Sequence, residues 1–321
     1  MSGLGDRRAF GSMVRQVAPL CLGGNVFGWT TDQETSFAVL DAYVAAGGNF
    51  IDSANIYSAW VPGNQGGESE RILGDWLKGR GDSGDVIIAT KLGMEGGAFR
   101  KGLTRDLIRR GVEGSLERLG VDRIDLLYAH EDDAGTPLSE TMEAFDEVVR
   151  EGLVEAVAAS NYSAARLEES LRVSEQGGYV AFAGLQPHFN LLDRDPEVLA
   201  AIDLCDARSL GVAPYFALAR GFLAGKYHPG DEIPGTPRAA GVQRDYFNDR
   251  GWHMLAAVER IAGERGATAA QVSLAWLMAH PAVTCPIASA TSVAQVTELV
   301  GAADLVLSDD EFAELDRLGA A

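Results

Sequence analysis

Cysteine, lysine and long apolar runs are all scarce in this chain of 321 residues. Its three cysteines, Cys21, Cys205 and Cys285, show no CxxC or CxxH spacing. Disulfides and a zinc site are therefore not expected, no metal is predicted, and a reducing cytoplasm is the expected location. No window approaches about 18 consecutive apolar residues, and the polar N-terminus leads into no apolar segment. Neither a transmembrane helix nor a signal peptide is expected.

Positively charged residues are also few in this sequence. The chain has 46 Asp and Glu against 27 Lys and Arg, a formal net charge of −19 at pH 7. A surface of that sign repels phosphate backbones and anionic lipids, so we expect neither a nucleic-acid partner nor a membrane partner. The chain contains only four lysines, Lys78, Lys91, Lys101 and Lys226. A lysine at the end of a strand therefore calls for a specific explanation.

Short apolar segments alternate with segments of helical period along almost the whole chain. The apolar segments predict strands at residues 19–23, 48–52, 86–91, 124–130, 154–160, 183–187, 212–216 and 283–287. Amphipathic segments between them predict helices, for example at residues 34–46, 68–78, 104–119, 138–150 and 164–175. Eight strands that alternate with helices predict an α/β fold, a closed (β/α)8 TIM barrel formed by residues 1–321 as a single domain. An open doubly wound sheet is the alternative, but no GxGxxG follows the first strand.

Two segments are too long for ordinary barrel loops. Residues 220–251, after the seventh strand, are punctuated by glycine and proline and predict a long loop. Residues 305–321 predict a C-terminal tail with a short helix capped at Ser308. Such additions are where a barrel would adjust its specificity.

Four titratable residues come from three neighbouring predicted strands and the loop that follows the first of them. Asp52 ends the second strand and Tyr57 follows five residues later, while Lys91 ends the third strand and His130 the fourth. Active sites of such barrels lie at the carboxyl ends of the strands. A single residue of this set would be explained by a salt bridge at the rim or by a hydrogen-bonded core histidine. Together the four predict a catalytic site.

Several segments resemble the aldo-keto reductase family. The run GNFIDSANIY from Gly48 to Tyr57 is similar to the family signature G-x-N-x-x-D-[ST]-A-x-x-Y, whose first glycine falls at Gly47, and residues 124–130 resemble its fourth strand. Ser160-Asn161, residues 186–190 and residues 215–227 resemble its cofactor-binding segments. The matches keep the order and spacing of the family from about residue 17 to residue 315.

The resemblance implies a reductase in which NADPH delivers a hydride to the carbonyl group of an aldehyde or ketone. Negative charge that develops on the carbonyl oxygen requires a proton donor there. We assign Tyr57 as this general acid and expect Lys91 to lower its pKa from the ordinary value of about 10. Asp52 would keep Lys91 charged, and His130 would orient the carbonyl oxygen or assist proton transfer.

The resemblance also implies how the cofactor is held. Ser160, Asn161 and Gln186 would bind the carboxamide, and Tyr215 would stack on the nicotinamide ring. The pyrophosphate would lie along residues 218–226, where Arg220 or Lys226 adds charge. His188 lies in one of these segments, and we predict no role for it. The full set of expected cofactor-binding residues is Gly24, Asn25, Ser160, Asn161, Gln186, Tyr215, Ala217, Leu218, Arg220, Gly225, Lys226, Ala288, Ser289, Thr291, Gln295 and Glu298.

The choice between NADPH and NADH depends on residues 286–298. This segment aligns with the part of the family that binds the adenosine 2′-phosphate, where many members place a cation, but here Thr291 stands in that place and the segment has no Lys or Arg. Ser289, Thr291 and the start of a helix near Ser292 can still offer hydroxyl and backbone donors. NADPH/NADP+ is favoured, and NADH is left open.

The substrate pocket is predicted from two tryptophans. Trp29, in the loop after the first strand, and Trp60, just past Tyr57, would line its mouth and suit aromatic, sugar or polycyclic carbonyl compounds. The acidic run Glu131-Asp132-Asp133 would disfavour anionic substrates if it faced the site, but a solvated loop is the favoured interpretation. The oligomeric state is not predicted.

Two other functions are compatible with such a barrel. A non-catalytic NADPH-binding subunit that regulates a membrane channel would bind cofactor without turning over a carbonyl substrate. A sugar epimerase or dehydratase would form product without net consumption of cofactor. The complete Asp52, Tyr57, Lys91 and His130 set favours the reductase.

Overall fold

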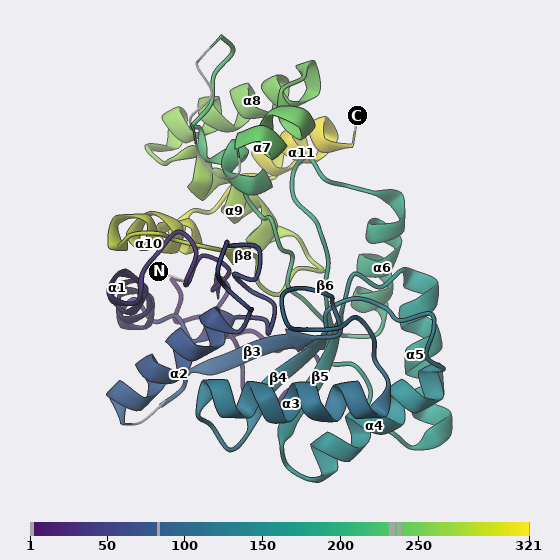
Figure 1. Cartoon of the computed structure of the whole chain (residues 1–321). Coiled ribbons are helices and arrows are strands. Elements are labelled where there is room, and N and C mark those ends of the chain that lie inside the picture. Colours follow the sequence, from purple (N-terminus) through teal and green to yellow (C-terminus); the bar gives the residue numbers. More distant parts are fainter. Residues whose placement is uncertain (1–2, 82–83, 231–234, 236–238, 321) are drawn as a thin grey trace.

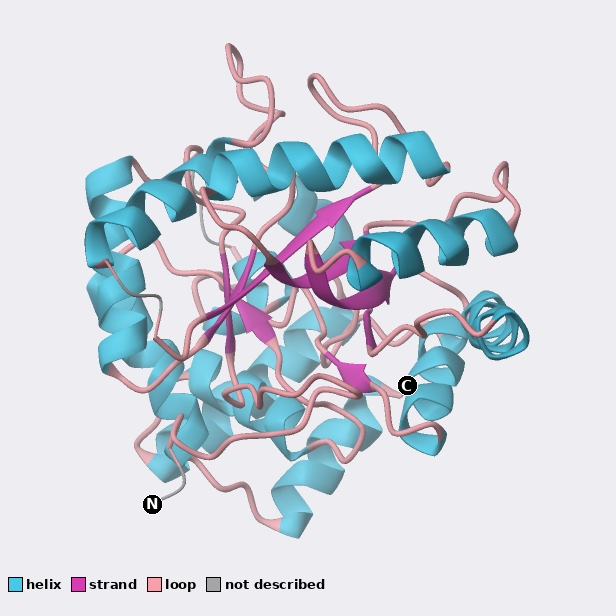
Figure 2. Cartoon of the chain, turned by 90° about the horizontal axis from the view of Figure 1, so that it is seen from below, coloured by secondary structure: helices cyan, strands magenta, loops and turns pink. Residues whose placement is uncertain are grey.

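Eight short parallel strands form the centre of the molecule, and helices surround them (Figure 2). This computed structural model describes residues 3–81, 84–230, 235 and 239–320. The strands are β1 (Cys21–Gly23), β2 (Phe50–Asp52), β3 (Ile87–Leu92), β4 (Ile124–Ala129), β5 (Val154–Ser160), β6 (Gly184–Gln186), β7 (Gly211–Val212) and β8 (Ile287–Ala288). They pair in the order β7-β6-β5-β4-β3-β2-β1-β8, so β8 returns to lie beside β1.

Backbone hydrogen bonds also join the two ends of this order. The amides of Thr284 and Cys285, just before β8, donate to Val212 O in β7 at 2.8 and 3.2 Å. Ile287 N donates to Pro214 O at 2.8 Å. The sheet therefore closes into the predicted (β/α)8 barrel, and the open doubly wound sheet is ruled out.

Helices follow the strands along the chain and pack against the outside of the barrel. They are α1 (Gln33–Ala45), α2 (Glu68–Arg80), α3 (Arg105–Leu119), α4 (Leu138–Arg150), α5 (Ala164–Gly177), α6 (Pro196–Ala207), α7 (Ala239–Tyr246), α8 (Asp249–Arg265), α9 (Ala269–Ala279), α10 (Val293–Val300) and α11 (Asp309–Gly319). α7, α8 and α11 gather on one side of the molecule, near the C-terminus (Figure 1).

Local signals in the sequence account for several helix ends. Asp32 begins α1 by accepting a hydrogen bond from Thr35 N, as an N-cap aspartate does. Gly120 ends α3 with a left-handed φ of 64°, which a residue without a Cβ adopts at little cost. Ser308 caps α11 in a reciprocal capping box with Glu311, so the helix predicted for the C-terminal tail is confirmed.

The amino-terminal end of the barrel is closed by the chain that precedes β1. Arg8 and Val17 form an antiparallel bridge, and Phe10, between them in the sequence, is completely buried. A Cβ atom at Gly184 or Gly211 would come within 2.5 Å of the Phe10 ring, so these two glycines make room for it. Phe10 therefore fills part of the amino-terminal end of the barrel.

The structure differs from the prediction in the loop after β7 and in the lengths of several strands. The predicted loop 220–251 is partly helical, because Val242 and Tyr246 of α7 are buried and Tyr246 stacks on Phe222 at 5.6 Å between ring centroids. Residues 231–234 and 236–238 of that loop lie outside the described residues. β7 and β8 are shorter than expected: Phe216 turns the chain out of the sheet with a φ of 54°, and Pro286 has no N–H to donate.

Candidate active site

A cavity of about 570 Å³ opens at the carboxyl ends of the strands. Its volume lies in the usual range for a small-molecule site. Of the residues predicted to form the site, those that line it are Asn25, Trp29, Asp52, Tyr57, Trp60, His130, Ser160, Asn161, Gln186, Tyr215, Ala217, Leu218, Arg220, Lys226, Ala288, Ser289, Thr291 and Gln295.

Four predicted site residues do not line the cavity. Lys91 is completely buried beneath it. Gly24 lies behind Asp52, to whose carbonyl its amide donates, and Gly225 caps a short 3-10 helix (Ala219–Ala224) with a φ of 71°. Glu298 lies on α10, where its carbonyl accepts a hydrogen bond from the side chain of Gln271. Gly24, Gly225 and Glu298 therefore lie outside the residues that line the cavity, and their contact with a cofactor stays a prediction.

The sequence analysis missed other residues that line the cavity. They include Val26, Thr30, Ile56, Met94, Phe216 and Tyr227. Phe216 and Tyr227 belong to the segment already associated with the cofactor, so that signal was present. Met94 follows Lys91 by three residues in the loop after β3, and its place after a strand end was the available signal.

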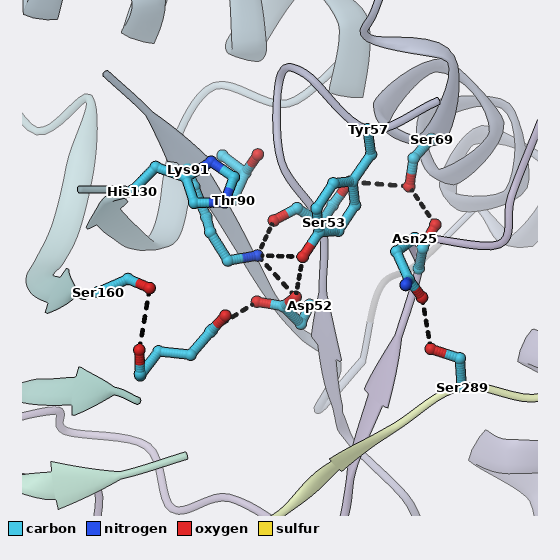
Figure 3. A network of polar contacts seen from close by, with 12 residues as sticks. Asn25, Asp52, Ser53, Tyr57, Ser69, Thr90, Lys91, His130, Ser160 and Ser289 are labelled. Atoms are coloured by element: carbon cyan, nitrogen blue, oxygen red, sulfur yellow. Dashed lines mark hydrogen bonds and ion pairs between the residues drawn. The ribbon is translucent and has the colours of Figure 1, made fainter. Parts of the chain in front are cut away.

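The predicted catalytic residues meet at the floor of the cavity (Figure 3). Lys91 Nζ donates hydrogen bonds to Asp52 Oδ2 at 2.6 Å, Ser53 O at 2.6 Å and Tyr57 Oη at 2.7 Å. These three acceptors use all three N–H bonds of the ammonium group. Tyr57 Oη in turn donates to Asp52 Oδ2 at 3.0 Å. Asp52, Tyr57 and Lys91 therefore form one connected group.

Burial raises the pKa of Tyr57 well above its ordinary value, and the neighbouring Asp52 carboxylate raises it further. The expectation that Lys91 lowers the pKa of Tyr57 below its ordinary value is therefore wrong. The physical reason is that a phenolate here would be both desolvated and next to a carboxylate, and these two costs outweigh the stabilisation from the ammonium group. Tyr57 is therefore held in its protonated form.

Lys91 and His130 both lose basicity through burial. Burial lowers the pKa of Lys91, and Asp52 opposes this shift. Burial, with a smaller contribution from the charge of Lys91, lowers the pKa of His130 well below 6.5. The His130 ring is thus neutral at pH 7, and its Nδ1 is buried with no hydrogen-bond partner among the described residues. No described protein group therefore fixes which ring nitrogen carries the proton.

A constrained turn positions Tyr57. The next residue, Ser58, has a φ of 68°, a conformation that is costly for a residue with a Cβ. Ser58 Oγ donates to Phe27 O at 2.8 Å, and Asn64 Nδ2 donates to Gly28 O at 3.1 Å. These bonds fasten the loop after β2 to the loop after β1. The constraint directs the Tyr57 side chain toward the carboxyl end of β2.

The residues expected to bind a carboxamide lie together between β4 and β7. Asn161, with a φ of 57°, donates from Nδ2 to His130 O at 2.9 Å, and its Oδ1 accepts from Tyr215 Oη at 2.8 Å. His188 stacks against Tyr215, with 5.2 Å between centroids and 17° between planes. This contact of His188 was not predicted. His188 therefore supports the Tyr215 ring, which also lines the cavity.

Arg220 and Thr291, which are predicted to meet the cofactor phosphates, both line the cavity and already contact other side chains. Arg220 pairs with Asp245 of α7 at 3.1 Å and lies over the Phe216 ring at 4.9 Å. Thr291 donates from both its N–H and its hydroxyl to Gln295 Oε1, at 2.8 and 3.1 Å. Thr291 and one terminal nitrogen of Arg220 therefore already have oxygen partners, whereas Arg220 Nε is buried without a hydrogen-bond partner among the described residues.

Aromatic and apolar side chains form the wall next to Tyr57. Trp29 and Trp60 meet edge to face with centroids 5.4 Å apart, and Trp60 lies 6.2 Å from Tyr57. Both tryptophans line the cavity, as predicted.

The acidic run after His130 is held in its own loop, as the sequence analysis favoured. Glu131 pairs with Lys101 at 3.0 Å, and Asp132 pairs with Arg166 at 2.9 Å. Asp133 accepts hydrogen bonds from backbone amides of the same region. None of the three acids is among the residues that line the cavity.

The family of the chain follows from comparison with known sequences. The sequence model of the aldo/keto reductase family matches residues 19–320, so the chain belongs to this family of oxidoreductases. It is 33% identical over 311 residues to an uncharacterized oxidoreductase of Bacillus subtilis (strain 168), covering 92% of this chain and 90% of that one. It is 32% identical over 317 residues to an aldo-keto reductase of Strobilurus tenacellus, covering 96% and 87%.

A relative with a different description matches equally well. The chain is 33% identical over 289 residues to a probable voltage-gated potassium channel subunit beta of Oryza sativa subsp. japonica, covering 87% of this chain and 85% of that one. Within the described residues of this chain, no helix is both long enough and apolar enough to cross a membrane. Those residues also include no group of three or more His, Cys, Asp or Glu side chains arranged to hold a metal ion.

Proposed function

We propose that this protein reduces the carbonyl group of an aldehyde or ketone to an alcohol with NADPH, and that Tyr57 is the proton donor. The observation that carries this proposal is the buried group at the cavity floor. Tyr57 Oη lies 2.7 Å from Lys91 Nζ and 3.0 Å from Asp52 Oδ2, beside a neutral His130. A protonated phenol next to an ammonium group fits the demand for a donor where an oxygen gains negative charge.

The residues of the cavity fit a nicotinamide cofactor. The Tyr215 ring, which lines the cavity, suits a flat ligand, and Ser160, Asn161 and Gln186 offer amide and hydroxyl groups for a carboxamide. Arg220 and Lys226 line the cavity and would bind the pyrophosphate, for which Arg220 must exchange its contact with Asp245. When bound, the reduced nicotinamide supplies the hydride.

Side chains of the protein donate the proton and stabilise the charge that is left behind. Tyr57 passes its proton from Oη to the carbonyl oxygen, and Lys91, already in contact with Oη, stabilises the phenolate that remains. Asp52 keeps Lys91 charged in its buried position. His130 orients the carbonyl oxygen from the neighbouring strand. The apolar wall of Trp29, Trp60 and their neighbours limits the access of water to these groups.

The first test is a spectrophotometric assay of the purified protein with NADPH, then NADH, against a panel of aldehydes, ketones and keto-sugars. We expect loss of the absorbance of the reduced nicotinamide that requires both the protein and a carbonyl compound. Cofactor binding is measured separately by quenching of tryptophan fluorescence, because Trp29 and Trp60 line the cavity. Binding without turnover across the panel would refute the proposal.

The choice of cofactor has its own test at Thr291. The Thr291→Arg variant is expected to shift the preference toward NADPH by about 1–2 kcal/mol, a factor of about 5–30, through a charge-assisted contact with the 2′-phosphate. The ratio of the dissociation constants for NADPH and NADH measures the shift. Thr297→Arg, at an exposed position of α10 just after Thr291 in the chain, is the matched control. An unchanged ratio in Thr291→Arg would show that this end of the cavity does not meet the 2′-phosphate.

A regulatory role is the second candidate, favoured by the likeness to a potassium channel subunit beta. It predicts tight NADPH binding, no carbonyl turnover and a stable complex with a membrane channel. The three cysteines are buried and unpaired, which fits a reducing cytoplasm under either function. The spectrophotometric assay separates the two functions, since only the reductase consumes cofactor.

A further inference from the structure

Gln186 contacts the catalytic group from across the barrel. It lies at the end of β6, and its Nε2 donates to Asp52 Oδ1 of β2 at 2.9 Å. Both side chains are only 2% exposed. An ionised carboxylate only accepts hydrogen bonds, so the amide must turn its NH2 group toward Asp52. The orientation of the Gln186 side chain is therefore set by Asp52 as well as by any ligand in the cavity.

This bond determines which way the carboxylate faces. Asp52 Oδ2 accepts from both Lys91 and Tyr57, whereas Oδ1 accepts from Gln186. With only the two Oδ2 bonds, the carboxylate could rotate about its Cβ–Cγ bond and its second oxygen would be buried without a donor. The Gln186 bond holds the plane of the carboxylate so that a single oxygen serves both Lys91 and Tyr57.

Gln186 is itself held firmly. Its backbone carbonyl accepts from Ser160 Oγ at 2.9 Å, and β5 and β6 pair with Ser160 opposite Gln186. We propose that Gln186 is a positioning residue for the proton donor, acting on Tyr57 through Asp52, in addition to any contact with the cofactor. The proposal rests on the proposed reductase function for its kinetic consequence, but the contact with Asp52 can be tested without it.

The Gln186→Glu variant separates the two roles of this side chain. If Gln186 only accepts a hydrogen bond from the cofactor carboxamide, a carboxylate accepts at least as well, and activity is retained as pH rises. If Gln186 must donate to Asp52, the substituted carboxyl can do so only while it is protonated. Two carboxylates in contact raise the pKa of one of them, to about 8–9 for a buried glutamate. We therefore expect kcat to be close to that of the wild type near pH 6 and about tenfold lower above pH 9.

A second readout does not depend on activity. The folded-state pKa of the substituted carboxyl is expected to exceed its unfolded value of about 4.3. As pH rises, the unfolded chain therefore loses this proton at a lower pH than the folded protein does. The Tm of the variant is then only slightly below that of the wild type below about pH 4, and the difference grows until about pH 8–9. Gln176→Glu, at an exposed position of α5, is the matched control for the added charge and is expected to show a flat difference.

Two further variants complete the test. Gln186→Leu cannot donate at any pH and is expected to lose activity without recovery in acid. Ser160→Ala alters the expected carboxamide site and removes the hydrogen bond to the Gln186 carbonyl but adds no ionisable group, so it is expected to weaken cofactor binding without a pH-dependent Tm difference. A flat Tm difference together with a pH-independent kcat ratio for Gln186→Glu would overturn the proposal. A pH-dependent Tm difference in a protein that turns over no carbonyl compound would refute the reductase function and keep the Asp52 contact.

Discussion

The Tyr57→Phe variant is expected to lose carbonyl reduction almost completely and to keep its affinity for the cofactor. The substitution removes only the hydroxyl group, which lies between Lys91 and Asp52 and is the proposed proton source. General acid catalysis typically contributes a factor of about 10²–10⁴, so kcat should fall by that amount. Steady-state assays give kcat, and fluorescence quenching gives the cofactor dissociation constant.

A matched control distinguishes a specific loss from a general one. Tyr179, next to the end of α5, lies outside the residues that line the cavity, so Tyr179→Phe is expected to keep wild-type turnover. If Tyr57→Phe retained more than about a tenth of wild-type turnover, a factor below the range for general acid catalysis, another group would have to donate the proton.

The Lys91→Met variant is expected to lose both activity and stability. Lys91 is completely buried, and its partner Asp52 is 2% exposed, so the substitution leaves a carboxylate in the core without its counter-charge. Breaking a buried ion pair by removing one partner costs about 3–5 kcal/mol. Denaturant unfolding should show this loss as a lower midpoint, and kcat should fall with it.

The double variant Lys91→Met/Asp52→Asn separates the stability effect from the catalytic one. With both charges removed, no uncompensated ion remains in the core, and we expect most of the lost stability to return. Activity should not return, because Tyr57 lacks the ammonium group that stabilises its phenolate. A double variant as unstable as Lys91→Met, or an active one, would contradict the role given to this pair.

The pKa of Tyr57 also bears on the pH dependence of the reaction. Because burial and Asp52 raise this pKa well above 10, the donor stays protonated throughout the neutral range. Reduction should therefore not lose its proton donor as pH rises from 6 to about 9, whereas a lowered pKa would produce a decline within that window. The pH profile of kcat/KM with a fixed carbonyl substrate measures this.

The positions of the candidate catalytic residues could be predicted because they depend on local sequence. Apolar runs end at Asp52, Lys91 and His130, and parallel strands of a barrel place all their carboxyl ends at one rim. Tyr57 follows the second predicted strand by five residues, and the resemblance to the aldo-keto reductase family added the proposed roles and the order of the cofactor segments. The structure confirms that Asp52, Tyr57 and His130 line one cavity, with Lys91 directly beneath it.

The energetics of the site were less accessible from the sequence. The presence of Lys91 beside Tyr57 suggested a lowered pKa, but the sign depends on how completely the phenol is desolvated and on its distance from Asp52. The cover of Tyr215 by His188 and the bond between Gln186 and Asp52 join residues that lie 27 and 134 positions apart. No local pattern encodes such contacts.

Sequence alone thus determined the alternation of strands and helices, the rim on which the polar residues lie and the family. These follow from hydrophobic periodicity and from motifs that act over a few residues. The tertiary structure decided that α7 forms within the predicted loop, which donors are already satisfied, and the direction in which the pKa of Tyr57 moves. These depend on burial and on hydrogen bonds across the barrel, which exist only after distant segments have packed together.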